Sequence, residues 1–200
     1  MDGLSIRRRI ALDIARSMRK SQEEEHPLRQ LFWECTLRCN LRCQHCGSDC
    51  KQVAATPDMP KEDFFKVLDS IAAKTDPHKV FVIISGGEPT MRADLEECGK
   101  GIYSRGFPWG MVTNGFGMTA ERFSRLLGAG LHSMTVSLDG LEENHDWLRG
   151  REGSFTRAAE TIRMAVRSGI AFDVVTCVNR RNYSQLPLLK EFLIGLGLNE

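Results

Sequence analysis

Five of the seven cysteines in this 200-residue chain lie within twenty residues, in the segment LFWECTLRCNLRCQHCGSDC at positions 31–50. Thiolates bind zinc and iron–sulfur clusters, and two thiols can instead form a disulfide. Cys39, Cys43 and Cys46 have a C-x3-C-x2-C spacing that no other three cysteines of the chain share. Eight residues are few enough for one loop to wrap a single inorganic cluster. The spacing therefore indicates a metal centre, but it leaves open which metal.

The expected cellular location favours a metal site over disulfides. The longest apolar run is VFVII at 80–84, and arginines interrupt the apolar pattern of the first twenty residues, so neither a membrane span nor a signal peptide is expected. We therefore predict a cytoplasmic protein, where thiols stay reduced and clustered cysteines usually bind metals. Four nearby thiols with His45 could also bind zinc, although zinc sites usually have two CxxC-like knuckles and this loop has one.

The other four cysteines are predicted to have less direct roles. Cys98 falls inside a predicted helix, Cys177 inside a predicted strand and Cys35 on the strand before the loop, so each is expected to be a small buried side chain. Cys50 is near the triplet but outside its spacing.

A ferredoxin cluster has four cysteine ligands, so three ligands leave one iron able to bind a substrate or cofactor directly.

A repeated strand–loop–helix pattern surrounds the cysteines. Strands are predicted at 31–36, 79–85, 110–115, 133–140 and 172–179, and helices at 61–74, near 92–104, from Thr119, from Ser154 and near 185–195. This alternation is typical of an α/β fold with a parallel sheet and crossover helices. The polar strings TLRCNLRCQHC, GGEPT, TNG, SLDG and VNRRN each follow a strand, where barrel-type folds build their sites.

A separate amphipathic helix is predicted over residues 4–20. Its apolar residues recur every four positions: Ile6, Ile10, Ile14 and Met18. We expect this helix to pack on the body of the domain rather than to bind a partner. The chain is accordingly divided into an N-terminal helix and linker (1–30) and an α/β core (31–200).

Composition adds two exclusions. The hydrophobic fraction of 42% and the near balance of 27 basic and 26 acidic residues predict a globular domain. A net charge of +1, without a basic stripe, gives no reason to expect nucleic acid or a membrane as partner. The one GxGxx-like string, GAGLHS from Gly128, precedes a strand, whereas a dinucleotide fingerprint must follow one.

The motifs together resemble those of the radical SAM superfamily. CNLRCQHC has its CxxxCxxC signature, and GGEPT, about forty residues later, resembles its GGEP motif. WECTLRCNLRC and SLDG…HDWLRGREGSF are similar to its SPASM-containing peptide and cofactor maturases. The resemblance implies a partial (βα)6 barrel with about five strand–helix units present. It also implies a chain truncated before the sixth unit and before the SPASM region.

The resemblance further implies two cofactors. Cys39, Cys43 and Cys46 are expected to hold a 4Fe–4S cluster, and the amino and carboxylate groups of S-adenosylmethionine to bind its fourth iron. An electron from a donor such as flavodoxin or ferredoxin then splits the sulfonium, and the resulting 5′-deoxyadenosyl radical abstracts hydrogen from a substrate. The protein binds and orients these groups, while the cofactors supply the electron transfer and the radical.

Ten residues are expected to contact the S-adenosylmethionine: His45, Gly86, Gly87, Glu88, Pro89, Thr113, Asn114, Ser137, Asp139 and Arg149. The two glycines permit close backbone approach to the ammonium group, and Glu88 offers it an acceptor. Arg149 is expected either to pair with the methionyl carboxylate or to form a surface ion pair. His45 is expected either beside the adenine or in ordinary loop packing. The other polar residues follow strands, where the family contacts carboxylate and ribose.

The predicted function is that of an enzyme that starts radical chemistry on a substrate. The substrate is expected to be a ribosomally made peptide undergoing maturation. The alternatives are an enzyme of tetrapyrrole or other cofactor biosynthesis acting on a small molecule, and a non-catalytic iron–sulfur or zinc module. GGEPT favours the enzyme, because an electron carrier needs no glycine-opened site beside its cluster. No catalytic residue beyond the cofactor contacts is assigned.

Overall fold

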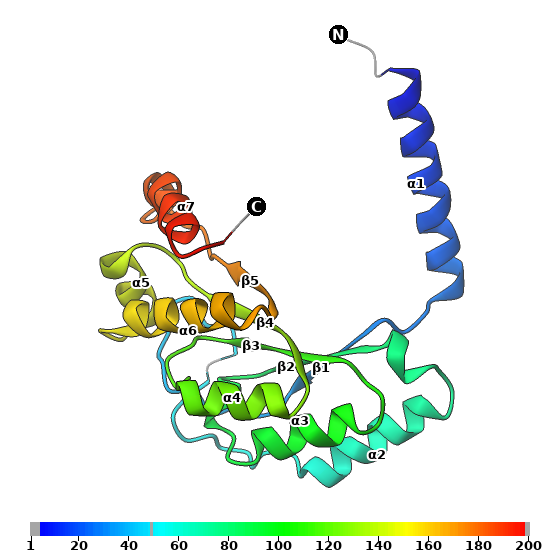
Figure 1. The fold of residues 1–200 in the computed structure, drawn as a ribbon, viewed down its shortest axis with the longest axis horizontal. Helices are drawn as coiled ribbons and strands as arrows, with labels where there is room; N and C mark the ends of the chain where they lie inside the picture. The colour runs from blue at the N-terminus through cyan, green and yellow to red at the C-terminus, as the bar shows by residue number, and fades with distance from the viewer. Residues whose placement is uncertain (1–4, 49, 199–200) are drawn as a thin grey trace.

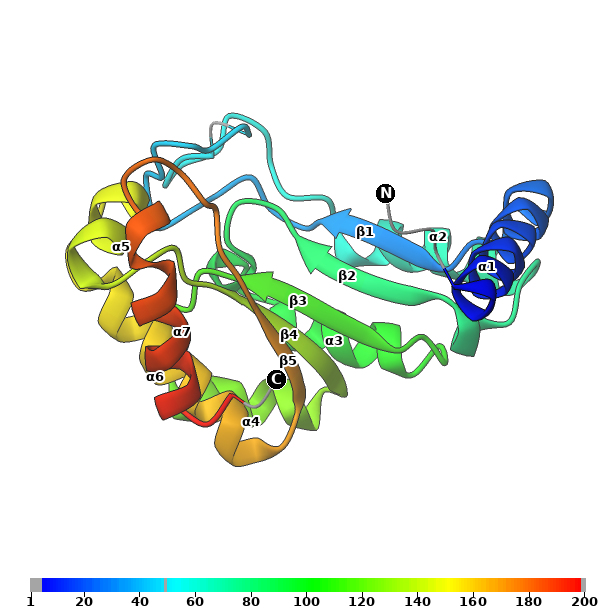
Figure 2. The ribbon, with the colours of Figure 1, turned by 90° about the horizontal axis from the view of Figure 1, so that it is seen from above.

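A computed structural model describes residues 5–48 and 50–198, which form a curved parallel sheet with helices packed along it (Figure 1). The strands are β1 (Gln30–Glu34), β2 (Phe81–Ser85), β3 (Trp109–Thr113), β4 (Leu131–Ser137) and β5 (Ala171–Val175). They lie side by side in chain order, and each neighbouring pair is parallel. The sheet curves without closing (Figure 2). The predicted α/β fold, a partial barrel built from strand–helix units, is confirmed.

The helices agree with the predicted ones, with one addition. They are α1 (Ile6–Glu25), α2 (Lys61–Ala72), α3 (Leu95–Tyr103), α4 (Ala120–Gly128), α5 (Glu142–Arg149), α6 (Ser154–Ser168) and α7 (Leu186–Gly195). The added helix is α5, in the segment between the strand predicted at 133–140 and the helix predicted from Ser154. Thr119 caps α4 as expected, because its hydroxyl accepts the N–H of Arg122 at 3.1 Å. Within the described residues, no helix has the length and apolar character needed to cross a membrane.

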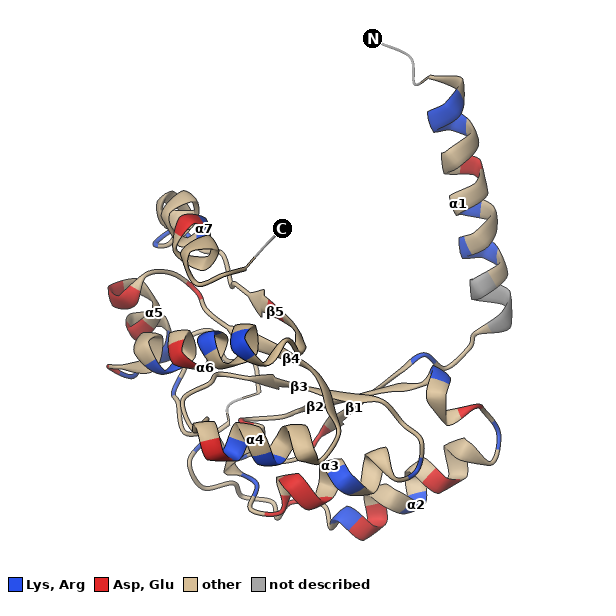
Figure 3. Ribbon diagram, in the orientation of Figure 1, with Lys and Arg blue, Asp and Glu red and all other residues tan. Residues whose placement is uncertain are grey.

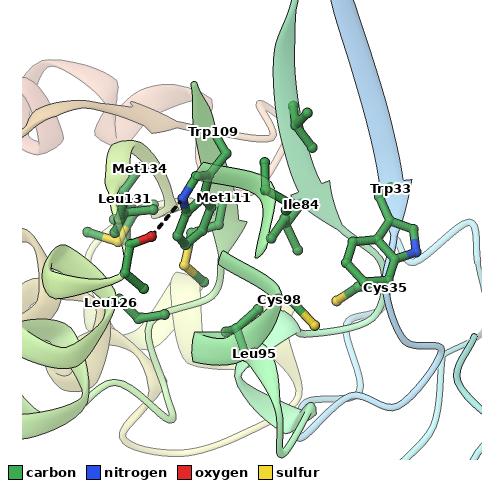
Figure 4. Packing of buried hydrophobic residues seen from close by; sticks show 14 of the residues in the cluster. Trp33, Cys35, Ile84, Leu95, Cys98, Trp109, Met111, Leu126, Leu131 and Met134 are labelled. Atoms are coloured by element: carbon green, nitrogen blue, oxygen red, sulfur yellow. Dashed lines mark hydrogen bonds between the residues drawn. The ribbon is translucent and has the colours of Figure 1, made fainter. Parts of the chain in front are cut away.

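The core lies between the sheet and the helices α2, α3, α4 and α6. Alternate residues of β2 are buried, with Val82 and Ile84 fully inaccessible, as expected when one face of a sheet is packed. Trp109 lies at the centre, and its indole N–H donates to the Ala129 carbonyl at 3.2 Å (Figure 4). Gly99 lets α3 approach this ring, since an added Cβ there would lie 2.3 Å from it. Cys35 and Cys98 are buried here, as predicted.

The predicted packing of the N-terminal helix is wrong. Helix α1 stands away from the sheet (Figure 1). The exposed fractions are 76% for Ile6, 54% for Ile10, 55% for Ile14 and 59% for Met18. On the packed face beside β1, the position is already taken by α2, whose Phe64 stacks on Trp33 with ring centroids 3.9 Å apart.

Charges of both signs are interspersed on α2, α3, α4 and α6 (Figure 3).

Candidate functional site

The loop after β1 folds back so that its cysteines gather at one end of the sheet. Arg38 and Lys51 form a parallel bridge, and the N–H of Cys39 donates to the Lys51 carbonyl at 2.8 Å. Within the loop, the N–H of Cys46 donates to the Cys43 carbonyl at 3.2 Å. These bonds hold the two ends of the cysteine loop side by side.

Helix α5 holds the other side of this loop. The N–H of Gln44 donates to the Leu148 carbonyl at 2.8 Å, and its side-chain amide to the Trp147 carbonyl at 2.9 Å. The N–H of Arg42 donates to the Arg149 carbonyl at 3.3 Å. The last carbonyls of a helix lack partners within the helix. The cysteine loop supplies these partners, which fixes its position against α5.

The glycine pair after β2 extends the pairing of β1 and β2 beyond the strands. The N–H of Gly87 donates to the Thr36 carbonyl at 2.7 Å, and that of Glu88 to the Arg38 carbonyl at 2.9 Å. Gly86 has a φ of +130°, and a Cβ there would lie 2.3 Å from the Thr36 oxygen. A Cβ on Gly87 would lie 2.2 Å from the Arg38 oxygen. Only glycine fits this close approach of two backbones.

The carboxylate of Glu88 ties the ends of β2 and β3 together. Its Oε1 accepts from the Thr113 hydroxyl at 2.7 Å and from the N–H and hydroxyl of Thr90 at 3.1 and 2.8 Å. Its Oε2 accepts from the N–H of Asn114 at 2.7 Å. The residue is 1% exposed. Its observed partners are thus protein donors, and the carboxylate sets the position of Thr113 and Asn114.

Two N–H donors approach the thiols of the predicted ligands. The side-chain amide of Asn114 lies 3.9 Å from Cys39 Sγ, and Nη1 of Arg149 lies 3.7 Å from Cys43 Sγ. Nε of Arg149 donates to Asp139 Oδ2 at 2.6 Å, and both residues are buried. The surface ion pair considered for Arg149 is therefore wrong, because the pair is buried.

Burial dominates the acidity of these thiols. The pKa of Cys39 is raised to about 11, mainly by burial and also by nearby Glu88, Cys43 and Cys50, against a backbone hydrogen bond that lowers it. Burial also raises the pKa of Cys43, on which Arg149 has the opposite effect. A metal cation reverses this preference, since a coordinating thiol is deprotonated outright.

Asp139 connects this site to the loop after β5. Its Oδ1 accepts the N–H of Cys177 at 2.8 Å, and its own N–H donates to Nδ1 of His145 at 3.0 Å. The predicted burial of Cys177 within a strand is wrong, because β5 ends at Val175 and Cys177 is exposed. Its backbone N–H is bonded to a carboxylate instead of a neighbouring strand.

These elements enclose a cavity of about 160 Å³ at the carboxyl ends of the first four strands. Eleven of the residues predicted from the sequence line this cavity: Cys39, Cys43, His45, Cys46, Gly86, Gly87, Glu88, Thr113, Asn114, Ser137 and Arg149. Two predicted residues lie outside it. Pro89 begins a buried 3-10 turn, and Asp139 lies behind Arg149. A second cavity of about 700 Å³ shares the walls formed by Cys43, Cys46 and Cys50.

Some residues of the site were not predicted. The cavity is also lined by Ser48, Cys50, Ser85 and Val112. Asn40 accepts the Asn114 amide at 2.9 Å, and its place directly after Cys39 was the available signal. Asp58 accepts from the Thr36 hydroxyl at 2.7 Å and pairs with Arg38, but it lies in a segment without a recognisable pattern.

The residues present fit a 4Fe–4S cluster. Three thiols are gathered at one cavity, two of them have N–H donors directed at sulfur, and the facing wall is backbone without side chains at Gly86 and Gly87. Soft thiolates suit iron–sulfur clusters, and hydrogen bonds to sulfur are one means of setting their potentials. Among the described residues, no three His, Cys, Asp or Glu side chains could share a single metal ion. A cluster does not require this, because each thiolate binds its own iron.

Known proteins resemble this chain over most of its length. The family model for the radical SAM superfamily matches residues 33–193. Fe-coproporphyrin III synthase of Methanosarcina barkeri is 32% identical over 163 residues, which cover 82% of this chain and 40% of the synthase. PqqA peptide cyclase of Methylocella silvestris is 28% identical over 168 residues, which cover 84% of this chain and 44% of the cyclase.

A solved structure shares the fold. The crystal structure of Streptococcus suis SuiB bound to S-adenosylmethionine superposes with a TM-score of 0.70 at 17% identity, over 100% of this chain and 46% of SuiB. This chain thus spans less than half of each protein it resembles here. The superfamily uses a 4Fe–4S cluster with S-adenosylmethionine. On the family match and the site geometry together, the chain belongs to the radical SAM superfamily.

Proposed function

We propose that this chain is the core of an enzyme that cleaves S-adenosylmethionine reductively, with Cys39, Cys43 and Cys46 as ligands of a 4Fe–4S cluster. The observation that carries the proposal is the cavity where these three cysteines meet the side-chain-free backbone of Gly86 and Gly87. When bound and reduced, the cluster supplies the electron that splits the sulfonium and yields a 5′-deoxyadenosyl radical. A non-catalytic iron–sulfur or zinc module would have no need of the part of the cavity beside Gly86 and Gly87.

The residues around the cavity are proposed to bind and orient the cofactor. Gly86 and Gly87 leave room for its ammonium group to approach the backbone. Glu88 acts on it through Thr113 and Asn114, whose positions the carboxylate fixes. Arg149 holds positive charge against Cys43, where it offsets the negative charge of a thiolate.

Two polar side chains at the rim complete the proposed site. Ser137 ends β4 and lines the cavity, where its hydroxyl can bond to the carboxylate or ribose of the cofactor. His45 is exposed on the loop between two ligands and also lines the cavity, and we propose that it packs against the adenine of the cofactor. Asp139 and Pro89 act indirectly: Asp139 orients Arg149 and Pro89 starts the turn after Glu88.

For the substrate we propose a ribosomally made peptide. The support for this proposal is the 28% identity to PqqA peptide cyclase of Methylocella silvestris, an enzyme named for its action on a peptide. A tetrapyrrole is the second candidate, favoured by the 32% identity to Fe-coproporphyrin III synthase against 28% to PqqA peptide cyclase. We further propose that residues 31–200 act as one cytoplasmic catalytic domain, reduced by a donor such as flavodoxin or ferredoxin.

The first experiment tests the cluster and the cleavage. Protein reconstituted anaerobically with iron and sulfide should hold about four irons per chain. It should release 5′-deoxyadenosine when S-adenosylmethionine and dithionite are added. Alanine at Cys39, Cys43 or Cys46 should abolish both results, whereas alanine at the exposed Cys177 should leave both unchanged. Stoichiometric zinc without sulfide, or a cluster that never yields 5′-deoxyadenosine, would contradict the proposal.

The second experiment separates the substrates. The full-length reconstituted enzyme is incubated with peptides encoded beside its gene or with iron coproporphyrin III, and the products are analysed by mass spectrometry. Loss of hydrogen or a new crosslink in a peptide supports the first candidate. Change in the porphyrin alone supports the second and leaves the cofactor chemistry intact.

A further inference from the structure

A fourth cysteine lies at the cofactor cavity. Cys50 lines the same 160 Å³ cavity as Cys39, Cys43 and Cys46, and it also lines the adjoining 700 Å³ cavity with the last two. The spacing of the signature does not include it. The residues that bring it there are those that close the cysteine loop.

The loop closure determines on which side of the site Cys50 lies. The Arg38–Lys51 bridge and the bond from Cys39 N–H to the Lys51 carbonyl hold the neighbour of Cys50 beside the first ligand. A Cβ built on Gly87 would lie 3.2 Å from the Cβ of Cys50. Cys50 therefore lies against the glycine pair, on the wall where the ammonium group of S-adenosylmethionine is proposed to approach.

This placement puts two ligands in competition for one iron. The three cysteines of the signature leave one iron without a protein ligand, and a fourth thiolate is the usual ligand in a ferredoxin. We propose that Cys50 binds the open iron while S-adenosylmethionine is absent and is displaced when S-adenosylmethionine binds. The inference rests on the proposed function, because it needs the cluster to be present.

The exchange balances without any oxidant or reductant. The bond between iron and Sγ of Cys50 breaks, and the amino nitrogen of S-adenosylmethionine donates its lone pair to the iron. The ammonium group must lose a proton to do so, and the leaving Cys50 thiolate takes that proton. Cys50 is half-buried at the junction of the two cavities. The released thiol can therefore turn toward the larger cavity as the cofactor enters.

The test uses oxidation to report on the open iron. Ferricyanide removes an electron and one unprotected iron from a 4Fe–4S cluster, and the 3Fe–4S product is followed by electron paramagnetic resonance. Without S-adenosylmethionine, the reconstituted wild-type protein should resist this conversion, and Cys50→Ala should convert readily. Adding S-adenosylmethionine should protect the variant. Cys177→Ala is the matched control and should behave as wild type, since its thiol does not line the cavity.

Cofactor affinity gives a second measurement. A ligand that must wait for an open site has its apparent Kd raised by the reciprocal of the open fraction, so an iron open about one tenth of the time predicts about tenfold tighter binding in Cys50→Ala. Cys50→Ser serves if the alanine variant does not fold. Equal oxidation rates and equal affinities in variant and wild type would overturn the inference.

Two further outcomes are distinguishable. If Cys50→Ala loses iron as completely as Cys46→Ala, Cys50 is a permanent ligand and cannot be displaced, which also overturns the inference. If wild-type protein itself takes up no cluster, the proposed function fails first. The iron content of the wild type therefore separates failure of the proposed function from failure of this inference.

Discussion

Replacing Glu88 with glutamine should destabilise the rim of the sheet whichever way the new amide is turned. With its NH2 group in the place of Oε2, it faces the N–H of Asn114, now 2.7 Å from the carboxylate. With NH2 in the place of Oε1, it faces the N–H of Thr90, now at 3.1 Å. Each orientation sets two donors against each other at a residue that is 1% exposed.

The magnitude follows from these bonds. A hydrogen bond to a charged group contributes about 1.5–3 kcal/mol, and a buried donor left unpaired costs about 1–3 kcal/mol. We therefore expect Glu88→Gln to lower the free energy of unfolding by about 2.5–6 kcal/mol. The hydroxyls of Thr90 and Thr113 can rotate to suit either orientation, so they do not add to this figure.

Urea denaturation of the metal-free protein measures this effect without the cluster. The control is Glu121→Gln, on the exposed surface of α4, where the carboxylate pairs with Arg125 at 2.7 Å. Surface pairs of this kind contribute about 0.5 kcal/mol, so the control should move the midpoint little. If Glu88→Gln and Glu121→Gln unfold at the same urea concentration, with the same dependence of the free energy on urea, the reasoning is refuted.

Two further predictions concern Gly87 and His145. Gly87→Ala places a Cβ 2.2 Å from the Arg38 carbonyl, so we expect about 1–3 kcal/mol of destabilisation by urea denaturation and less iron after reconstitution. Gly128→Ala, with nothing within 4 Å of the added Cβ, should be neutral or stabilising by about 0.5–1 kcal/mol, and equal effects of the two changes would count against the argument. Burial, aided by Arg149, lowers the pKa of His145 from its ordinary 6.5 to about 4. The unfolded chain therefore binds a proton that the folded one does not, and stability should fall by up to about 3 kcal/mol as the pH drops from about 6.5 to about 4. Denaturation of His145→Gln across that range should show a shallower loss, and a loss as steep as that of the wild type would contradict the assignment.

Most of the correct predictions depended on the spacing of residues within short segments of the sequence. The C-x3-C-x2-C triplet and the glycine pair lie within short loops, and alternating strands and helices place both at one edge of a parallel sheet. Those facts alone bring Cys39 and Gly87 to one cavity. The individual contacts to S-adenosylmethionine stay predictions, since they depend on a molecule that the sequence only implies.

Helix α5 was missed because its stability comes from distant partners. Its eight residues, EENHDWLR, are mostly polar and show no apolar stripe. Its last carbonyls are satisfied by the cysteine loop, about a hundred residues earlier in the chain. Asp146 within it caps α6, accepting the N–H groups of Gly153 and Phe155 at 2.7 Å each. Such long-range bonds leave no periodic trace in the sequence.

The two wrong burial predictions have a common cause. Periodicity showed that α1 has an apolar side and that Cys177 sits among β-forming residues. Neither observation says whether a neighbour is available. The place beside β1 is occupied by α2, and Asp139 accepts the backbone N–H of Cys177 just beyond the strand.

The strand order has a consequence for how the cluster site is assembled. Each strand pairs only with the one before and after it in the chain, but the distances differ: Trp109 pairs with Leu131 about twenty residues later, and Gln30 with Phe81 about fifty residues later. Closing a longer loop costs more chain entropy. Among the described strands, β1 and β5 each have one neighbour, and the connection from β1 to β2 is longer than that from β4 to β5. The strand that carries the cysteine loop is therefore the one that docks last and opens first. Hydrogen exchange should be slowest at β3 and β4 and faster at β1. A cluster bound by the loop after β1 and by no other strand would slow the opening of β1.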